Sequence, residues 1–79
     1  MSPYDILRSL RRRPFQPLRV FLSDGSHHDV RHPEMVFVTR RSVSIAIEPI
    51  RNQVPDDYVL CDPLHITRIE PLASDGARR

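Results

Sequence analysis

Residues 18–31 constrain the fold of this chain more than any other stretch, because apolar and polar side chains alternate there around an Asp-Gly pair. A period of two is typical of a β-strand that is buried on one face. Asp24 and Gly25 both tolerate the positive φ of a type I′ turn, which joins two antiparallel strands. The sequence therefore predicts a hairpin in which residues 26–31 return beside the first strand. The aliphatic positions of that first strand are Leu18, Val20 and Leu22.

A helix is predicted before this hairpin, over residues 3–13. Ser2 is a suitable N-cap, Pro3 suits the first helical position, and Asp5 completes a capping pattern. Pro14 ends the helix, because proline lacks an amide hydrogen and disfavours helical backbone at the residue before it. An apolar stripe at helical spacing must pack against the rest of the chain. The residues of that stripe are Tyr4, Ile6, Leu7 and Leu10.

Further strands are predicted after the hairpin. Residues 35–39 carry apolar side chains on both faces, which indicates a central strand buried on both sides. Residues 43–47 alternate cleanly, whereas the polar segment 49–57 contains two prolines and is predicted to be the longest loop. A short strand over residues 58–61 and a final strand over residues 66–72 complete the order.

The predicted fold class is mainly β (α+β). One N-terminal helix followed by five or six antiparallel strands of about five residues favours a small, strongly bent barrel over a flat sheet. A chain of 79 residues forms one domain that buries only about 60–65% of its unfolded surface, so self-association would help it. We expect this domain to cover residues 1–72, with residues 73–79 as a flexible tail.

Arginine carries all the positive side-chain charge, since none of the twelve basic residues is lysine, yet the formal net charge is only +2. Residues 1–41 hold eight arginines against four acidic residues, and the remainder holds four against six. This asymmetry permits contact of a basic face with RNA, another polyanion or an acidic protein, but it is far weaker than the basic stripe of a dedicated nucleic-acid binder. Codon usage in a GC-rich genome is an equally valid explanation. The candidate nucleic-acid-binding residues are Arg8, Arg11, Arg12, Arg13, Arg19, Arg40 and Arg41.

The histidines and the cysteine indicate neither a metal site nor an active site. His27 and His28 are neighbours on a strand and therefore point to opposite faces, which keeps them from converging on one metal ion. Cys61 lies in an apolar strand without a glycine-bearing oxyanion loop nearby, which is typical of a buried structural cysteine. We expect no enzymatic activity, no metal and no cofactor.

The cellular location that the sequence suggests is the cytoplasm. Cys61 is the only cysteine, so no intramolecular disulfide is possible. The N-terminus lacks the apolar core of a secretory signal, and no segment approaches the roughly 20 apolar residues that span a bilayer. The sequence therefore predicts a cytoplasmic protein with no membrane contact.

The four residues Arg31, His32, Pro33 and Glu34 form a corner at which the strand pattern breaks. One interpretation is structural: Pro33 ends the strand, and Glu34 pairs with a nearby arginine. The alternative is a corner that a partner protein contacts.

Two resemblances follow from particular motifs. The order of predicted elements is similar to that of the Sm-like barrel, specifically its bacterial Hfq branch, over roughly half of the chain. The matching segments are residues 6–12, 20–25 and 66–71. The stretches at residues 14–26, 32–34 and 64–72 resemble P-F-x-P-x-R-x-x-L-S-D-G-S, H-P-E and L-H-I-T-R-I-E-P-L in a group of small bacterial proteins, a resemblance that implies no function.

The Hfq resemblance implies a ring-shaped RNA chaperone with a uridine pocket and basic rim residues. The glutamine of that pocket falls on Pro3, its stacking aromatic residue on Met35, and its lysine-histidine pair on Pro63 and Leu64. Only the rim arginines are retained, as Arg11, Arg12 and Arg13. The resemblance therefore supports a barrel but no uridine pocket.

Two functional hypotheses remain for a non-enzymatic small-barrel module. One is weak binding of RNA or DNA through the arginine-rich face, with an affinity that falls steeply with salt. The other is a protein-interaction or homo-oligomeric assembly module that uses an edge strand and has no role in nucleic-acid binding.

Overall fold

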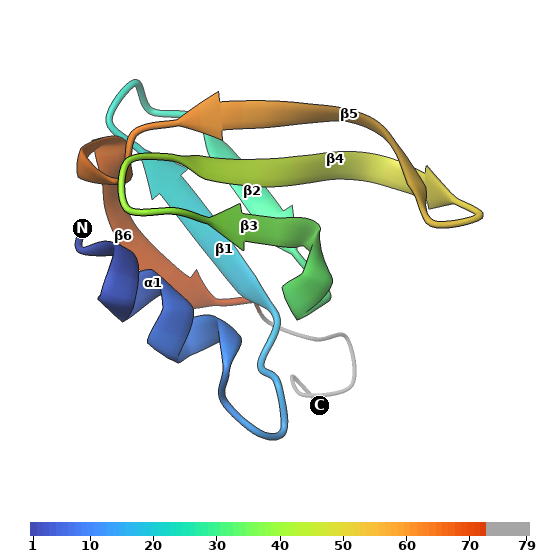
Figure 1. Ribbon diagram of the computed structural model, residues 1–79, viewed down its shortest axis with the longest axis horizontal. Coiled ribbons are helices and arrows are strands. Elements are labelled where there is room, and N and C mark those ends of the chain that lie inside the picture. The colour runs from blue at the N-terminus through green and yellow to red at the C-terminus, as the bar shows by residue number, and fades with distance from the viewer. Residues whose placement is uncertain (73–79) are drawn as a thin grey trace.

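A computed structural model of the protein describes residues 1–72, so the tail predicted at residues 73–79 lies outside the described residues. The described chain holds one α-helix, six strands in antiparallel pairs and two 3₁₀ turns (Figure 1). The mainly β, α+β class is thereby confirmed. The elements are α1 (Pro3–Leu10), β1 (Leu18–Leu22), β2 (His27–Val30), η1 (Pro33–Met35), β3 (Val36–Val38), β4 (Val43–Arg51), β5 (Val54–Cys61), η2 (Pro63–His65) and β6 (Ile66–Pro71).

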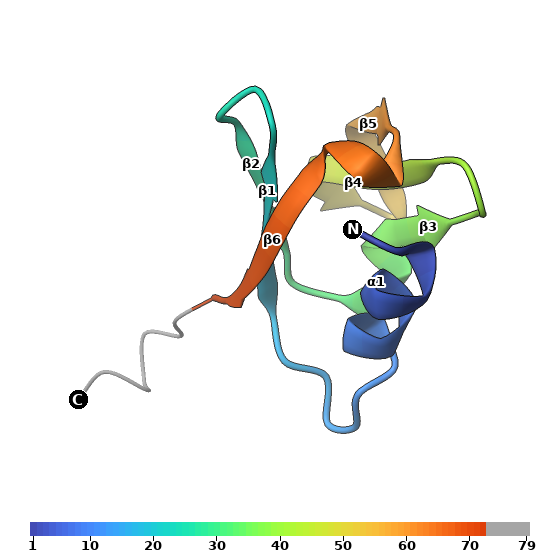
Figure 2. The same ribbon diagram turned by 90° about the vertical axis from the view of Figure 1, so that its left-hand side faces the viewer.

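The strands form two sheets and not the single bent barrel that the sequence predicts. The first sheet has the order β2-β1-β6 and the second the order β3-β4-β5, and no strand pairing among residues 1–72 joins them. The 3₁₀ turns that start at Pro33 and Pro63 stand at the two crossings between the sheets, where proline offers no amide hydrogen to continue a ladder. Figure 2 shows the first sheet edge-on, with the second sheet and α1 on one side of it.

Helix α1 begins as predicted but ends three residues early. The Ser2 hydroxyl accepts a hydrogen bond from the Tyr4 amide at 3.0 Å, which confirms the N-cap. Arg11 is the C-cap, and its amide donates to the Leu7 carbonyl at 2.9 Å. Ile6 and Leu10 are buried. Tyr4 was predicted to belong to the same buried stripe, but its side chain is 65% exposed.

The β1–β2 hairpin is confirmed, although its turn is not type I′. Among residues 1–72 a positive φ occurs in this turn only at Gly25 (φ 90°), whereas a type I′ turn requires two such residues. The Gly25 amide donates to the Leu22 carbonyl at 3.0 Å, and the Leu22 amide donates to the Ser26 carbonyl at 2.9 Å. A type I turn followed by a left-handed glycine fits this pattern. The Asp24 carboxylate accepts from both the amide and the hydroxyl of Ser26.

The predicted loop over residues 49–57 is wrong, because β4 and β5 continue through almost all of it. Asn52 (φ 52°) and Gln53 (φ 67°) alone connect the two strands. Two consecutive residues with positive φ are the geometry of a type I′ hairpin turn. The ladder shifts register between Ile47 and Ile50 and then resumes with Ile50 opposite Pro55. The hairpin therefore extends past the remainder of the second sheet (Figure 1).

The core lies between the sheets and α1 and contains nine buried apolar side chains. Val43 and Ile45 are buried on β4, in agreement with the alternation of residues 43–47. The prediction of a central, doubly buried strand at residues 35–39 is wrong: β3 is at the edge of its sheet, and Phe37 is 72% exposed. The core residues are Ile6, Leu10, Leu18, Val20, Val30, Met35, Val43, Ile45 and Ile66.

Candidate functional site

The face of the second sheet that points away from the core is apolar and exposed. Phe37 of β3 lies opposite Ser44 of β4, which lies opposite Leu60 of β5, so the three side chains share this face. Tyr58 lies two residues before Leu60 on β5 and therefore on the same face. We call Phe37, Ser44, Tyr58 and Leu60 the outer face.

The exposures of the outer face are high for apolar side chains: 72% for Phe37, 63% for Leu60 and 59% for Tyr58. Single exposed apolar residues are common on protein surfaces, whereas contiguous apolar patches usually mark interaction sites. The sequence pattern did not predict this patch, because the apolar residues on both faces of 35–39 indicate that Phe37 is buried. The signal that could have found it is the alternation at residues 58–61, which places Tyr58 and Leu60 on one face.

Strand β5 adds a backbone edge to this face. Among residues 1–72 it pairs only with β4, so its other side is an open strand edge. The Tyr58 amide on that side donates to the Asp57 carboxylate at 2.8 Å. Proline and charged side chains protect edge strands from pairing, and Pro55, Asp56 and Asp57 provide both over the first half of β5. Residues 58–61 carry neither, and backbone groups of alternate residues point away from β4, so a short open edge centred on Leu60 lies next to the outer face.

Three of the seven candidate nucleic-acid-binding arginines have structural partners. Arg8 pairs with Asp5 at 2.8 Å, one turn earlier in α1. The Arg13 guanidinium donates to the carbonyl of Arg12 at 3.0 Å and of Leu10 at 3.5 Å, at the end of the helix. Arg19 binds the Asp29 carboxylate through two hydrogen bonds of 2.7 and 3.2 Å. The guanidiniums of these three arginines are therefore engaged within the chain.

The other four candidates lie in two separate groups. Arg11 and Arg12 line a shallow hollow with Tyr4 and Leu7 at the end of α1. Arg40 and Arg41, in the turn between β3 and β4, line a different hollow beside the start of α1. Within the described chain none of these four guanidiniums has an ion-pair partner. The predicted arginine-rich face is therefore two smaller basic groups at opposite ends of the helix.

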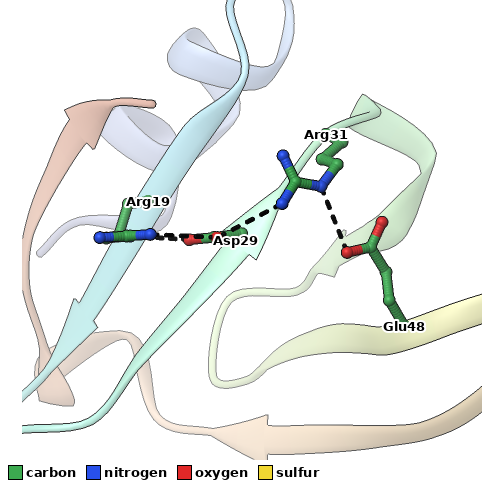
Figure 3. Close-up of polar contacts among 4 residues, drawn as sticks. All are labelled: Arg19, Asp29, Arg31 and Glu48. Atoms are coloured by element: carbon green, nitrogen blue, oxygen red, sulfur yellow. Dashed lines mark hydrogen bonds and ion pairs between the residues drawn. The ribbon is translucent and has the colours of Figure 1, made fainter. Parts of the chain in front are cut away.

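A chain of ion pairs connects the two sheets on the solvent side (Figure 3). The Asp29 carboxylate forms ion pairs with Arg19 Nε at 2.7 Å and with Arg31 Nη2 at 3.6 Å. The Nε atom of Arg31 also pairs with Glu48 Oε1 at 3.3 Å. The hydrogen bond from Arg19 lowers the pKa of Asp29, and the nearby charges of Arg19 and Arg31 act in the same direction. This ion-pair chain ties β2 to β4.

In the predicted contact corner, Arg31 and Pro33 have structural roles, but the ion pair is made by Arg31 and not by Glu34 as expected. Arg31 pairs with Glu48 and Asp29, whereas Glu34 has no ion pair within the described residues. Pro33 starts η1 after His32, which confirms that it breaks the strand. His32 and Glu34 line a hollow of about 360 Å³ between η1 and the β4–β5 hairpin. The corner is accessible to a partner.

The histidines His27, His28 and His65 have separate neighbours and form no cluster. His27 is exposed and its ring lies 5.8 Å from that of Phe21, while His28 is the β-sheet partner of Val20 on the opposite face. His65 exchanges a 3.0 Å hydrogen bond with the Ser23 hydroxyl. Among residues 1–72 no three His, Cys, Asp or Glu side chains are placed to hold a metal ion. Burial raises the pKa of the Cys61 thiol, which disfavours the reactive thiolate.

Comparison with protein-family models, with curated proteins and with solved structures finds no match to this chain. Within residues 1–72 no helix combines the length and the apolar character needed to cross a bilayer.

Proposed function

We propose that this chain is a non-enzymatic protein-interaction module that self-associates through the outer face and the adjoining edge of β5. The observation that carries the proposal is the joint exposure of Phe37, Tyr58 and Leu60 on one face, beside a short open strand edge centred on Leu60. Strand addition at such an edge supplies backbone hydrogen bonds, and the flanking side chains supply apolar contact.

The apolar contribution of one side chain sets the size of the expected effect. Complete burial of a leucine is worth about 1.5–3 kcal/mol, and 63% of Leu60 is still exposed in the single chain. Burial of that remainder would contribute about 1–2 kcal/mol for each copy. A symmetric dimer buries two copies, so we expect Leu60→Ser to weaken the dimer by roughly 2–4 kcal/mol, or about 30-fold or more.

Sedimentation equilibrium of the purified chain over a range of concentrations tests this proposal. We expect a concentration-dependent dimer or higher oligomer, and a dissociation constant at least about 30-fold higher for Leu60→Ser. Leu64→Ser is the matched control, because Leu64 is 80% exposed but belongs to η2 and not to the outer face. A chain that is monomeric at all concentrations, or equal weakening by both substitutions, would refute the proposal.

Nucleic-acid binding is a second candidate, and the hollow around Arg11 and Arg12 favours it. These two unpaired arginines adjoin the exposed ring of Tyr4, which suits a phosphate backbone and a stacked base. Fluorescence anisotropy of single-stranded RNA over a salt series measures the effect. We expect the double substitution of Arg11 and Arg12 to glutamine to reduce the log–log salt slope by about 1.4, the value for two contacts to single-stranded phosphates. Arg51→Gln, on the distant hairpin, should leave the slope unchanged.

A further inference from the structure

The β4–β5 hairpin overhangs the body of the protein and leaves part of its inner face uncovered. Strand β3 pairs with β4 only as far as Ile45, opposite Val36, whereas β4 runs on to Arg51 (Figure 1). The core-facing series of β4 continues past Ile45 to Ile47, and after the register shift Ile50 lies opposite Pro55. Ile47 and Ile50 therefore continue the apolar side chains beyond the end of the core, with Asp57 opposite Ile47.

The 3₁₀ turn η1 forms the opposite wall beneath this overhang. The space between them is the hollow of about 360 Å³, which is within the usual range for a binding pocket. Met35, Ile50 and Pro55 give it an apolar lining, and Glu34 and Glu48 supply two carboxylates. No arginine lines it, and its basic lining residue is His32.

The two carboxylates keep capacity for a further cation. The Oε1 atom of Glu48 accepts the Arg31 Nε at 3.3 Å, and its second oxygen has no side-chain donor within residues 1–72. Glu34 has neither an ion pair nor a side-chain hydrogen bond in the same part of the chain. A positively charged side chain with an apolar stem would complement both the apolar lining and the two carboxylates of the hollow.

We propose that the hollow under the overhanging hairpin binds an arginine side chain from an extended segment of another protein. The methylene stem would pack on Ile50 and Pro55, and the guanidinium would bridge Glu34 and Glu48. Arginine fits better than lysine, because its planar fork of donors matches carboxylates in geometry. This site is separate from the outer face, so its failure would leave the proposed self-association unaffected.

The test uses the full chain labelled with ¹⁵N and two short peptides followed by NMR. The probe is acetyl-Val-Arg-Val-amide, and the control peptide replaces arginine with citrulline, which has nearly the same shape but no charge. We expect the arginine peptide to shift the amide signals of Met35, Ile50 and Gln53, all of which line the hollow. The citrulline peptide should bind about 100-fold more weakly, because it loses charge-assisted hydrogen bonds to both carboxylates, each worth about tenfold.

Variants assign the effect to the two carboxylates. We expect Glu34→Gln and Glu48→Gln each to weaken binding of the arginine peptide about tenfold, and Glu70→Gln on β6 to leave it unchanged. Glu34→Gln keeps the Arg31–Glu48 pair intact, so it separates loss of the site from loss of the fold. Equal affinity for the two peptides, shifts confined to other parts of the chain, or indifference of binding to Glu34→Gln would each overturn the proposal.

Discussion

Gly25 in the β1–β2 turn and Gln53 in the β4–β5 turn should respond oppositely when glycine is removed from one turn and introduced into the other. Gln53 holds a φ of 67° and Gly25 a φ of 90°, both in the left-handed region that L-residues other than glycine avoid. We expect Gln53→Gly to stabilise the protein and Gly25→Ala to destabilise it. A Cβ added at Gly25 would have no neighbour within 4 Å, so its effect is that of the backbone alone.

The magnitude follows from two opposing terms. Left-handed backbone costs an L-residue about 1–2 kcal/mol, and glycine costs about 0.5–1 kcal/mol in extra chain entropy. The difference is a gain of about 0.5–1 kcal/mol in the free energy of unfolding for Gln53→Gly, and a loss of similar size for Gly25→Ala.

Urea denaturation followed by circular dichroism measures both changes as shifts of the unfolding midpoint. The double variant should be close to the wild type, because the two turns belong to different sheets and the effects of separate sites add. A destabilising Gln53→Gly, or a neutral Gly25→Ala, would refute the assignment of these residues to left-handed turn positions.

Other predictions concern the core and the ion pairs. Ile45 is fully buried on the middle strand of its sheet, so Ile45→Ala should lower the free energy of unfolding by about 2–5 kcal/mol in the same urea experiment. Because the pKa of Asp29 is lowered in the folded chain, its contribution to stability is complete above the ordinary aspartate pKa and is lost as pH falls through the lowered one. Urea titrations at several pH values should therefore show Asp29→Asn to be less stable than the wild type near pH 7, with the difference disappearing in acid.

Local patterns predicted much of the fold. Alternation located β1, β2 and the first half of β4, and the capping residues located the start of α1. These features depend on neighbouring residues only, which is the information that a sequence pattern contains. The β4–β5 turn was missed because its positive-φ positions are Asn52 and Gln53, without the glycine that usually marks such a turn.

The features that depend on contacts between distant segments were not predictable in the same way. The apolar pattern around Phe37 fits a central strand, but burial is decided by which strands lie beside β3, and only β4 does. The sequence suggested that the candidate arginines form one basic face. In the structure Asp5 and Asp29 form ion pairs with two of them, Arg8 and Arg19. The pairs Arg11–Arg12 and Arg40–Arg41 lie at opposite ends of the helix. Partner choice across strands is tertiary information.

Hydrogen exchange at the free edge of β5 tests the proposed self-association most directly. The measurement follows the backbone amide of Leu60, which points away from β4, in the purified chain at low and high protein concentration. If copies associate through this edge, exchange of the Leu60 amide should slow as concentration rises, while exchange in the β1–β2 turn stays constant. Exchange at Leu60 that is the same at both concentrations would contradict the account.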